Sequence, residues 1–198
     1  MGKEIKAIVG CEESQVITKA MRRRGIEAYS CDLQDCSGGH PEWHIKGDIR
    51  DHFDDGWDIG IFHPDCTRLT NAANRWLYED CAKETAEERI ELREKDIEFF
   101  IECQNAPIDK IAVENPEPHP YVIERVGRYT DKVQPWMFGD PETKAVCWWL
   151  KNLPPLMSTI IESKRSDIKF RLPPSKERAK LRGKFFPGMA DAIAEQWG

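Results

Sequence analysis

Residues 4–32, EIKAIVGCEESQVITKAMRRRGIEAYSCD, decide the fold that the sequence predicts. The first seven are mostly apolar and end in glycine, which predicts a short buried strand. An amphipathic stretch over 12–24 predicts a helix, and Gly25 is suited to cap its end. A second strand is predicted over 27–31, closing on Asp32. A strand, a helix and a second strand in this order predict a parallel sheet with helices on its faces.

Strands and helices continue to alternate further along the chain. The sequence predicts strands at 57–62 and 110–113, and two strands within 133–150 around the turn at 139–141. It predicts a charged helix at 79–104 and helices within 175–198, separated by the Phe-Pro-Gly break at 186–188. The segments 35–46 and 151–174 are predicted to be irregular. The sequence has no internal repeat or low-complexity tract. We therefore expect a single α/β domain over 1–198, with a mostly parallel sheet and helices on both faces.

The composition limits the classes of function. Hydrophobic residues make up 40% and charged residues 32%, and no apolar run approaches the ~20 residues of a membrane span. The N-terminus lacks the anatomy of a secretion signal, so we expect a cytoplasmic protein without a membrane partner. The net charge of −6 does not favour a dedicated nucleic-acid binder, although the basic residues at 22–24 and 164–184 are either a solvated face or phosphate contacts. The seven cysteines are an odd, scattered set, which is typical of reduced thiols.

Chemically useful side chains lie where the predicted strands end. Asp32 closes the second strand, Pro64 and Cys66 follow the third, and Glu114 and Asn115 follow the fourth. In an open parallel sheet, ligands bind at the carboxyl edge of the strands. Taken singly, Asp32 is a common turn residue, and a free cysteine is more often a packing residue than a nucleophile. The carboxylate of Glu114 is suited to hold a substrate ring by hydrogen bonds and to protonate it.

The same residues, in the same order, resemble the cytosine-5 DNA methyltransferases. Five segments carry the resemblance: 8–12 at the family's first strand and loop, Asp32 at the end of the second strand, 47–51 with its aspartates, 64–67 in place of Pro-Pro-Cys, and 114–116 in place of Glu-Asn-Val. Residues 138–144 match the first half of the family's Phe-Gly-x-Pro-Gln-x-Arg-x-Arg stretch, and 185–197 resemble its closing Phe-Pro segment and last helix. The resemblance covers most of the chain as an outline. The arrangement is also similar to small phage-encoded methylase-like proteins.

The resemblance implies a Rossmann-like methyltransferase fold and methylation of carbon 5 of cytosine, with S-adenosylmethionine as methyl donor. Cys66 would add to carbon 6 of the pyrimidine, Glu114 would hold the ring nitrogen and the exocyclic amine, and Asn115 would shape the pocket. The implied cofactor-binding residues are Gly10, Cys11, Glu12, Asp32, Asp48, Ile49 and Pro64, and the implied substrate-binding residues are Thr67, Asn71, Arg75 and Lys144. DNA is the first expected substrate, and a cytosine nucleotide or a single-stranded nucleic acid is the alternative. A phage-encoded protein of this kind would act in the host cytoplasm.

Four features depart from the family pattern. Only 151–183 stands where members that read DNA carry a long target-recognition region, which implies low specificity or a protein partner that supplies it. Asp65 replaces the second proline, and its carboxylate would raise the pKa of the Cys66 thiol unless Arg68 offsets it. Lys144 alone keeps a positive charge where the family has two arginines, and the first loop lacks a run of glycines. A catalytically degenerate methyltransferase-fold binding protein is therefore a further alternative.

Two other chemistries involve residues of the same regions. Cys31, Cys36, His40 and His44 fall close enough in sequence to bind zinc, but their spacing matches no standard knuckle. Packed thiols and surface histidines are the favoured interpretation, and no metal is expected. The stretch 63–65 (HPD) is only partly similar to the Asp-Pro-Pro-Tyr hallmark of amino-methyltransferases, its order differs, and that chemistry would leave Cys66 without a role.

Overall fold

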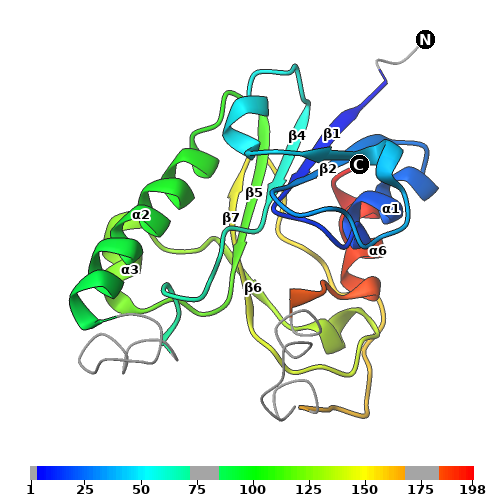
Figure 1. Ribbon diagram of the computed structural model, residues 1–198. Coiled ribbons are helices and arrows are strands. Elements are labelled where there is room, and N and C mark those ends of the chain that lie inside the picture. Colours follow the sequence, from blue (N-terminus) through cyan, green and yellow to red (C-terminus); the bar gives the residue numbers. More distant parts are fainter. Residues whose placement is uncertain (1–3, 72–84, 168–182) are drawn as a thin grey trace.

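A seven-stranded sheet forms the middle of the protein. In the computed structural model, which describes residues 4–71, 85–167 and 183–198, the strand order is β3-β2-β1-β4-β5-β7-β6 (Figure 1). The strands are β1 (Lys6–Gly10), β2 (Glu27–Asp32), β3 (His44–Lys46), β4 (Ile59–Phe62), β5 (Lys110–Asn115), β6 (Asp131–Val133) and β7 (Val146–Lys151). The pairs among β1 to β5 are parallel, and β7 is antiparallel to both β5 and β6. The prediction of a mostly parallel sheet is confirmed.

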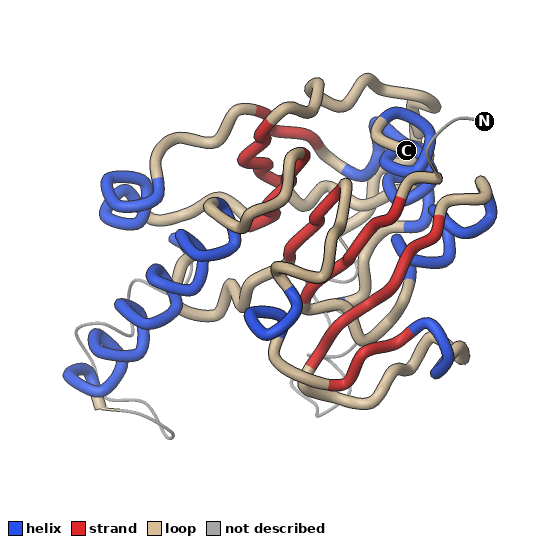
Figure 2. The backbone as a smooth tube through the Cα atoms, turned by 90° about the horizontal axis from the view of Figure 1, so that it is seen from above, coloured by secondary structure: helices blue, strands red, loops and turns tan. Residues whose placement is uncertain are grey.

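Helices cover both faces of the sheet, as the alternation of elements predicts. α1 (Val16–Arg23) and α6 (Pro187–Gln196) lie on one face, and α2 (Ala86–Gln104) and α3 (Pro120–Val126) lie on the other (Figures 1 and 2). Short 3-10 helices, η1 (Pro41–Trp43), η2 (Ile49–His52) and η4 (Pro135–Phe138), lie in the connections. None of the helices described has both the length and the apolar character needed to cross a membrane.

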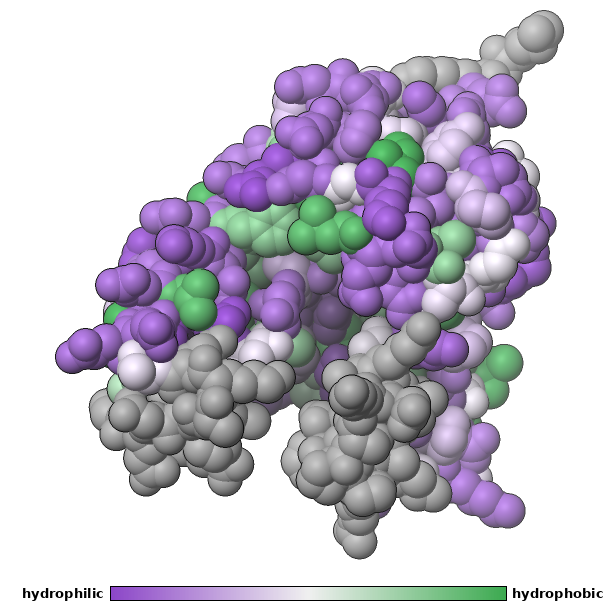
Figure 3. All heavy atoms as spheres, viewed as in Figure 1, coloured by the Kyte–Doolittle hydropathy of each residue, from purple (hydrophilic) through white to green (hydrophobic). Residues whose placement is uncertain are grey.

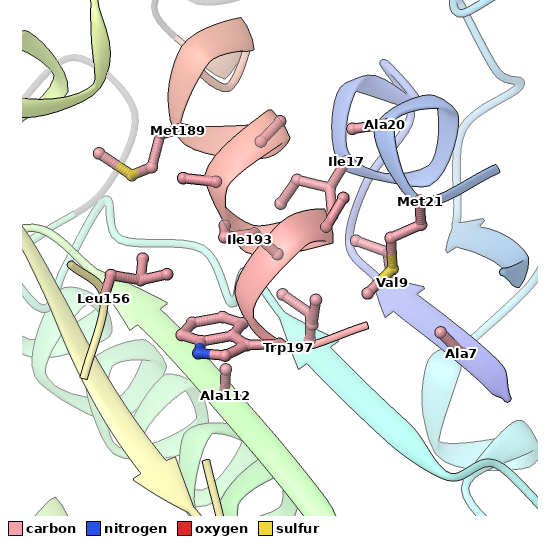
Figure 4. Packing of buried hydrophobic residues seen from close by; sticks show 14 of the residues in the cluster. Ala7, Val9, Ile17, Ala20, Met21, Ala112, Leu156, Met189, Ile193 and Trp197 are labelled. Carbon is pink, nitrogen blue, oxygen red and sulfur yellow. The ribbon is translucent and has the colours of Figure 1, made fainter. Parts of the chain in front are cut away.

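The central strands divide the core into two clusters because successive side chains point to opposite faces. In β1, Ala7 and Val9 pack on the side of α1 and α6, while Ile8 packs on the side of α2 and α3. Both faces are covered, which explains why the central strands are continuous apolar runs. Figure 4 shows the first cluster, in which Ile17 of α1 and Ile193 of α6 lie between their helices and the sheet.

α6 packs directly against α1 on this face. Two ion pairs join the helices at the surface, Arg23 with Asp191 at 2.6 Å and Arg24 with Glu195 at 2.8 Å. Salt bridges between exposed side chains contribute only about 0–1 kcal/mol each. Burial of apolar side chains contributes more to the stability of this contact, and it includes Trp197, whose side chain is only 2% exposed. The α1–α6 contact therefore depends on core packing more than on charge.

The first helix is shorter than predicted. It begins at Val16 and not at residue 12, because residues 11–15 form a loop in which Cys11 and Gln15 have φ angles of 60° and 55°. Left-handed backbone at such residues is uncommon and interrupts a helix. The predicted cap at Gly25 fits its φ of 80°.

Other boundaries differ where the elements are short. β3 lies within 35–46, which was expected to be irregular, because three residues are too few to show an alternating pattern. α3 was not predicted, although Pro120 occupies the first-turn position that proline favours. Of the two strands expected within 133–150 around the turn at 139–141, only the second is found, as β7; β6 already ends at Val133, and η4 occupies the place expected for the first. Residues 79–84 and 175–182 of the predicted helices lie outside the described residues.

Candidate active site

The sheet has its topological switch point between β1 and β4. From β1 the chain goes outward to β2 and β3, and it later returns to build β4 and β5 on the other side. In such sheets, ligands bind at the carboxyl ends of the strands beside the switch point. The register pairs Gly10 with Phe62 and Phe62 with Val113, so the residues that follow each of them lie in one row. These residues are Cys11, His63 and Glu114. The largely hydrophilic surface in Figure 3 is hollowed near its middle, where this edge of the sheet lies in Figure 1.

Glu114 is buried near the end of β5, on the side of α1 and α6. Its Oε2 lies 3.3 Å from Nδ1 of His63, and its Oε1 is buried without a hydrogen-bond partner among the described residues. Burial alone would raise the pKa of this carboxyl. The positive charge of Lys144 and the hydrogen bond from His63 together outweigh burial and hold the pKa below its ordinary value of 4.5. Glu114 is therefore an ionised acceptor at neutral pH.

Cys66 lies half-buried in the loop that follows β4. Burial raises the pKa of its thiol, and the negative charges of Glu114 and Asp65 raise it further, while Lys144 opposes them. The net direction is upward from 9.0, so the resting group at neutral pH is a thiol and not a thiolate. Cys66, Glu114 and Lys144 are thus close enough for their charges to act on one another.

Asp65 is engaged within its own turn. Its Oδ1 accepts hydrogen bonds from the backbone nitrogen of Thr67 at 2.8 Å and from the Thr67 hydroxyl at 2.6 Å. The prediction that Asp65 raises the pKa of the Cys66 thiol is confirmed, although burial is the larger cause. Arg68 pairs with the carboxylate of Asp96 in α2 at 3.1 Å, and its effect on Asp65 stays a prediction.

Replacement of Asp65 by asparagine tests this electrostatic effect. The asparagine side chain would still accept from Thr67 through its amide oxygen, so the turn is expected to persist without the negative charge. We expect Asp65→Asn to lower the pKa of the Cys66 thiol and to speed its alkylation by iodoacetamide roughly two- to fivefold at pH 8. The rate is measured from the mass of the peptide that contains Cys66. Asp55→Asn removes an exposed carboxylate elsewhere and is the control; alkylation that slows or stays constant in Asp65→Asn contradicts the expectation.

Asn115 is the last residue of β5 and is 1% exposed. Neither its amide nitrogen nor its amide oxygen has a hydrogen-bond partner among the described residues. Beside it, the loop that carries Cys66 crosses the segment after β5, where the nitrogen of His119 donates to the oxygen of Leu69 at 2.9 Å. Buried polar groups are costly when unpaired, so an amide of this kind marks a position from which a ligand can be held.

The ends of β1 and β2 carry carboxylates that fit a cofactor with hydroxyl groups and positive charge. Asp32 is half-buried, and only its Oδ1 has a described partner, the backbone nitrogen of Gln34 at 2.9 Å. Glu13, in the loop before α1, has a buried Oε2 with no partner among the described residues. S-adenosylmethionine carries ribose hydroxyls, an ammonium and a sulfonium, and carboxylate oxygens are acceptors for the first two and counter-ions for the charges.

Gly10, Ile49 and Pro64 have packing roles at the same edge. A Cβ atom on Gly10 would lie 2.7 Å from Cδ1 of Phe62 and 2.8 Å from Cγ1 of Ile49, so any larger residue would displace the core there. Ile49 is 3% exposed, and Pro64 is also buried. Contact of these residues, and of Cys11, with a cofactor stays a prediction.

Two of the predicted cofactor ligands have side chains with other partners. Glu12 is 4% exposed and caps α1 by accepting from the nitrogen of Ile17 at 2.6 Å and from the hydroxyl of Thr18 at 2.7 Å. Burial raises the pKa of Glu12 despite these bonds. Both carboxylate oxygens of Glu12 serve α1, and contact of Glu12 with a cofactor stays a prediction. Asp48 caps η2 and pairs with the guanidinium of Arg50, which lowers the pKa of Asp48. Contact of Asp48 with adenine would have to compete with Arg50.

Of the predicted substrate-binding residues, only some are shown to interact with the candidate site. Lys144 is exposed, and its charge acts on both Cys66 and Glu114. Thr67 is exposed and bonded to Asp65, and Asn71 is exposed, with its nitrogen 3.4 Å from the oxygen of Glu117. Arg75 lies outside the described residues. The structure therefore brings Lys144 to the candidate site.

His63 and Glu13 were not among the predicted site residues. His63 directly follows β4 in the row beside Glu114, and a polar residue at a strand end is the only sequence signal that it gives. Glu13 was assigned to a helix start, and its buried oxygen becomes visible only once the loop over 11–15 is known. Both depend on spatial neighbours that the sequence does not show.

Cys31 and His44, two of the four residues considered as zinc ligands, contact other groups. Cys31 is buried, with its sulfur 3.5 Å from the oxygen of Gly47, and His44 bonds to Ser30 and to the backbone of Gln34. Across the described residues, no group of three or more histidines, cysteines or carboxylates is close enough to hold a metal ion.

Comparison with known proteins shows a likeness in fold. No protein-family model matches the chain, and no curated protein sequence matches it. A solved structure described as a DNA modification methyltransferase encoded within an E. coli prophage is 14% identical, with a TM-score of 0.50, and the match covers 86% of this chain and 56% of that one. A methyltransferase of Entamoeba histolytica, EhMeth, is also 14% identical, with a TM-score of 0.51, and the match covers 88% of this chain and 61% of that one.

These similarities define the class of fold. The described residues have the Rossmann-like, mostly parallel sheet of methyltransferases, with helices on both faces, as the resemblance in the sequence predicted. The chain spans about three fifths of the length of these solved structures.

Proposed function

We propose that this protein is an S-adenosylmethionine-dependent methyltransferase that modifies carbon 5 of cytosine in DNA, with Cys66 as nucleophile. The observation that carries the proposal is the meeting of Cys66, Glu114 and Lys144 at the carboxyl edge beside the switch point, where Lys144 acts on both other groups and Glu114 acts on Cys66. A thiol, an ionised carboxylate with an unengaged buried oxygen and an exposed cation are the groups that covalent attack on a pyrimidine requires. The methyltransferase fold supports the same conclusion.

The cofactor would be held at the ends of β1 and β2. Asp32 would accept hydrogen bonds from the ribose hydroxyls, and Glu13 would face the positive charge of the methionine part. When bound, S-adenosylmethionine supplies an electrophilic methyl group that an activated carbon 5 can take. Cys11, whose φ of 60° turns the backbone at the end of β1, would line the floor of this site.

Cys66 would form the covalent bond to the substrate. Its thiolate adds to carbon 6 of the pyrimidine, and the electron pair of the carbon 5–carbon 6 double bond moves toward carbon 5 and the ring nitrogen. Glu114 would hold the exocyclic amine through Oε1, where no described residue competes. Carbon 5 would use this electron pair to bond to the methyl group. Carbon 5 would then lose its proton to a base such as water, and the electron pair of the broken C–H bond would restore the double bond as the Cys66 thiolate leaves. Asn115 would hold the ring from the other side of β5.

Lys144 would help to generate and use the thiolate. Its positive charge lowers the pKa of both Cys66 and Glu114, and it is exposed, so it can also meet a phosphate of the substrate. Because the net direction of the Cys66 pKa is upward, the thiolate would have to form within the complex with the substrate. Specificity for a DNA sequence would come from outside the described residues or from a protein partner.

Transfer of a labelled methyl group tests the proposal. Purified protein is incubated with S-adenosylmethionine labelled in its methyl group and, in separate arms, with duplex DNA, single-stranded DNA, single-stranded RNA and deoxycytidine nucleotides. We expect label in DNA that is recovered as 5-methylcytosine. Label found only in RNA or only in nucleotides would identify that molecule, and not DNA, as the substrate. Label on an exocyclic nitrogen would overturn the carbon 5 chemistry. Cofactor binding without transfer to any arm supports a degenerate binding protein in place of the enzyme.

A further inference from the structure

His63 occupies a position from which it can control Glu114. It directly follows β4, and its side chain is on the α1 and α6 side of the sheet, as is that of Glu114 on the neighbouring strand. Nδ1 of His63 lies 3.3 Å from Oε2 of Glu114, and only 12% and 11% of the two side chains are exposed. Hydrogen bonds between groups shielded in this way are stronger than the same bonds in water.

Aromatic rings fix the imidazole of His63. Its centroid lies 6.1 Å from that of Trp148 in an edge-on arrangement, and 5.1 Å from that of Phe185. Trp148 is opposite Glu114 in the register of β7 with β5, so the two partners of the hydrogen bond share one wall. The ring is therefore held by packing, which makes the direction of its hydrogen bond well defined.

The neighbouring atoms indicate which nitrogen carries the proton. Nε2 of His63 is buried without a partner among the described residues, so a proton on Nε2 would have no described acceptor. A proton on Nδ1 has one, because Oε2 of Glu114 can accept it. A proton on Nδ1 satisfies the pair, and the carboxylate keeps Oε1 as its remaining acceptor.

We infer that His63 is a positioning residue that donates from Nδ1 to Glu114 and so makes the site select a pyrimidine bearing an amine at carbon 4 over one bearing a carbonyl. This inference rests on the proposed function. An ionised carboxylate offers only acceptors. An amine donates to Oε1, whereas a carbonyl at the same position would face it with a second acceptor. If His63 did not donate to Oε2, the buried Glu114 would take up a proton more readily and would lose this discrimination.

Other charged groups act on the same pair. Lys144 influences Glu114, Glu114 influences the Cys66 thiol, and the buried carboxyl of Glu12 below α1 lies close enough to His63 for a charge on one group to act on the other. The neighbours Trp148 and Phe185 carry no charge. A substitution of His63 therefore changes the pKa of Glu114 while the contribution of Lys144 to that pKa stays the same.

Carbon-13 and nitrogen-15 NMR of labelled full-length protein test the inference without requiring activity. In the wild type, the His63 ring should show a protonated Nδ1 and a bare Nε2. His63→Leu removes the donor, and the Glu114 carboxyl, assigned with Glu114→Gln, should then titrate about one pH unit higher. His63→Asn keeps an amide donor near the place of Nδ1, so in this variant Glu114 should titrate close to its wild-type pH. His40→Leu is the control, because it removes a similar bond at the surface, in which Nδ1 of His40 lies 3.0 Å from Oε1 of Glu42. It should leave the titration of Glu114 unchanged.

Competition between cytosine- and uracil-containing strands adds the functional readout. In His63→Leu the preference for cytosine should fall about tenfold, and in His63→Asn it should fall less. An unchanged Glu114 titration in His63→Leu, an equal shift in His63→Asn, or a protonated Nε2 in the wild type would overturn the inference. If the wild type methylates none of the substrates but the titration shifts as expected, the proposed function fails while the link between His63 and Glu114 stands.

Discussion

Cys66→Ala is expected to abolish methyl transfer while the protein still binds S-adenosylmethionine. Removal of a covalent nucleophile leaves no route for addition to carbon 6, so the rate should fall by at least about 10³-fold. The residues proposed to hold the cofactor lie at the ends of β1 and β2 and do not depend on the thiol, so cofactor affinity should change less than about twofold. Transfer is measured with labelled cofactor, and affinity is measured by calorimetry.

Cys36→Ala is the matched control for this change. Cys36 is also a free, half-buried cysteine, but it lies in the loop after β2 and not after β4. Its replacement should leave transfer within about twofold of the wild type. Persistent transfer in Cys66→Ala would rule out a covalent mechanism, and a loss of cofactor binding in the same variant would place Cys66 in a different part of the site.

Glu114→Gln is expected to lower the rate of transfer by about 10²- to 10³-fold with little change in fold. Glutamine has nearly the same shape, and its amide oxygen can still accept the bond from Nδ1 of His63. Its amide nitrogen would then occupy the place of Oε1 and present a donor to the exocyclic amine of the substrate. Loss of one preorganised group that stabilises developing charge typically has this magnitude.

The same variant changes the dependence of stability on pH. The folded pKa of Glu114 lies below 4.5, so its ionised form contributes stability that is fully present above about pH 4.5 and is lost as the pH falls through the folded pKa. Glu114→Gln lacks this contribution, and its unfolding free energy should vary less between pH 5 and pH 3, in denaturant titrations at several pH values. Glu142→Gln, at a half-buried position in the connection before β7, is the control for a general charge effect; an identical pH dependence in both variants would contradict the lowered pKa of Glu114.

The sequence was sufficient to predict where the strands end. Buried strands such as β1, β4 and β5 are short apolar runs that stop at glycine, histidine or glutamate, so their carboxyl ends could be located before their neighbours were known. Parallel topology then predicts that residues at those ends meet. This is why Cys66 and Glu114 could be expected at one edge of the sheet, and why Lys144, which follows a matched motif, was included with them.

Partners that depend on register or on a distant helix were not predicted. The bond between His63 and Glu114 exists because β4 pairs with β5 in one particular register, which local patterns do not encode. Arg68 lies beside Asp96 because α2 crosses the loop after β4, and Glu12 turns under α1 because the helix starts four residues later than its pattern indicates. For Arg68 and Glu12, the partner that the structure shows depends on the position of a helix, which local sequence patterns do not give.

The contact between α1 and α6 has a consequence for synthesis on the ribosome. The apolar face of α1 is complete after the first two dozen residues, yet the helix that covers it is made of Pro187–Gln196. At typical translation speeds, the interval between the two is on the order of ten seconds or more. During that time Ile17 and Met21 lack their final neighbours, and Phe185 is not yet present to cover His63. The nascent chain therefore exposes an apolar helix face that chaperones can bind, and the ring of His63 gains its contact with Phe185 only late in translation.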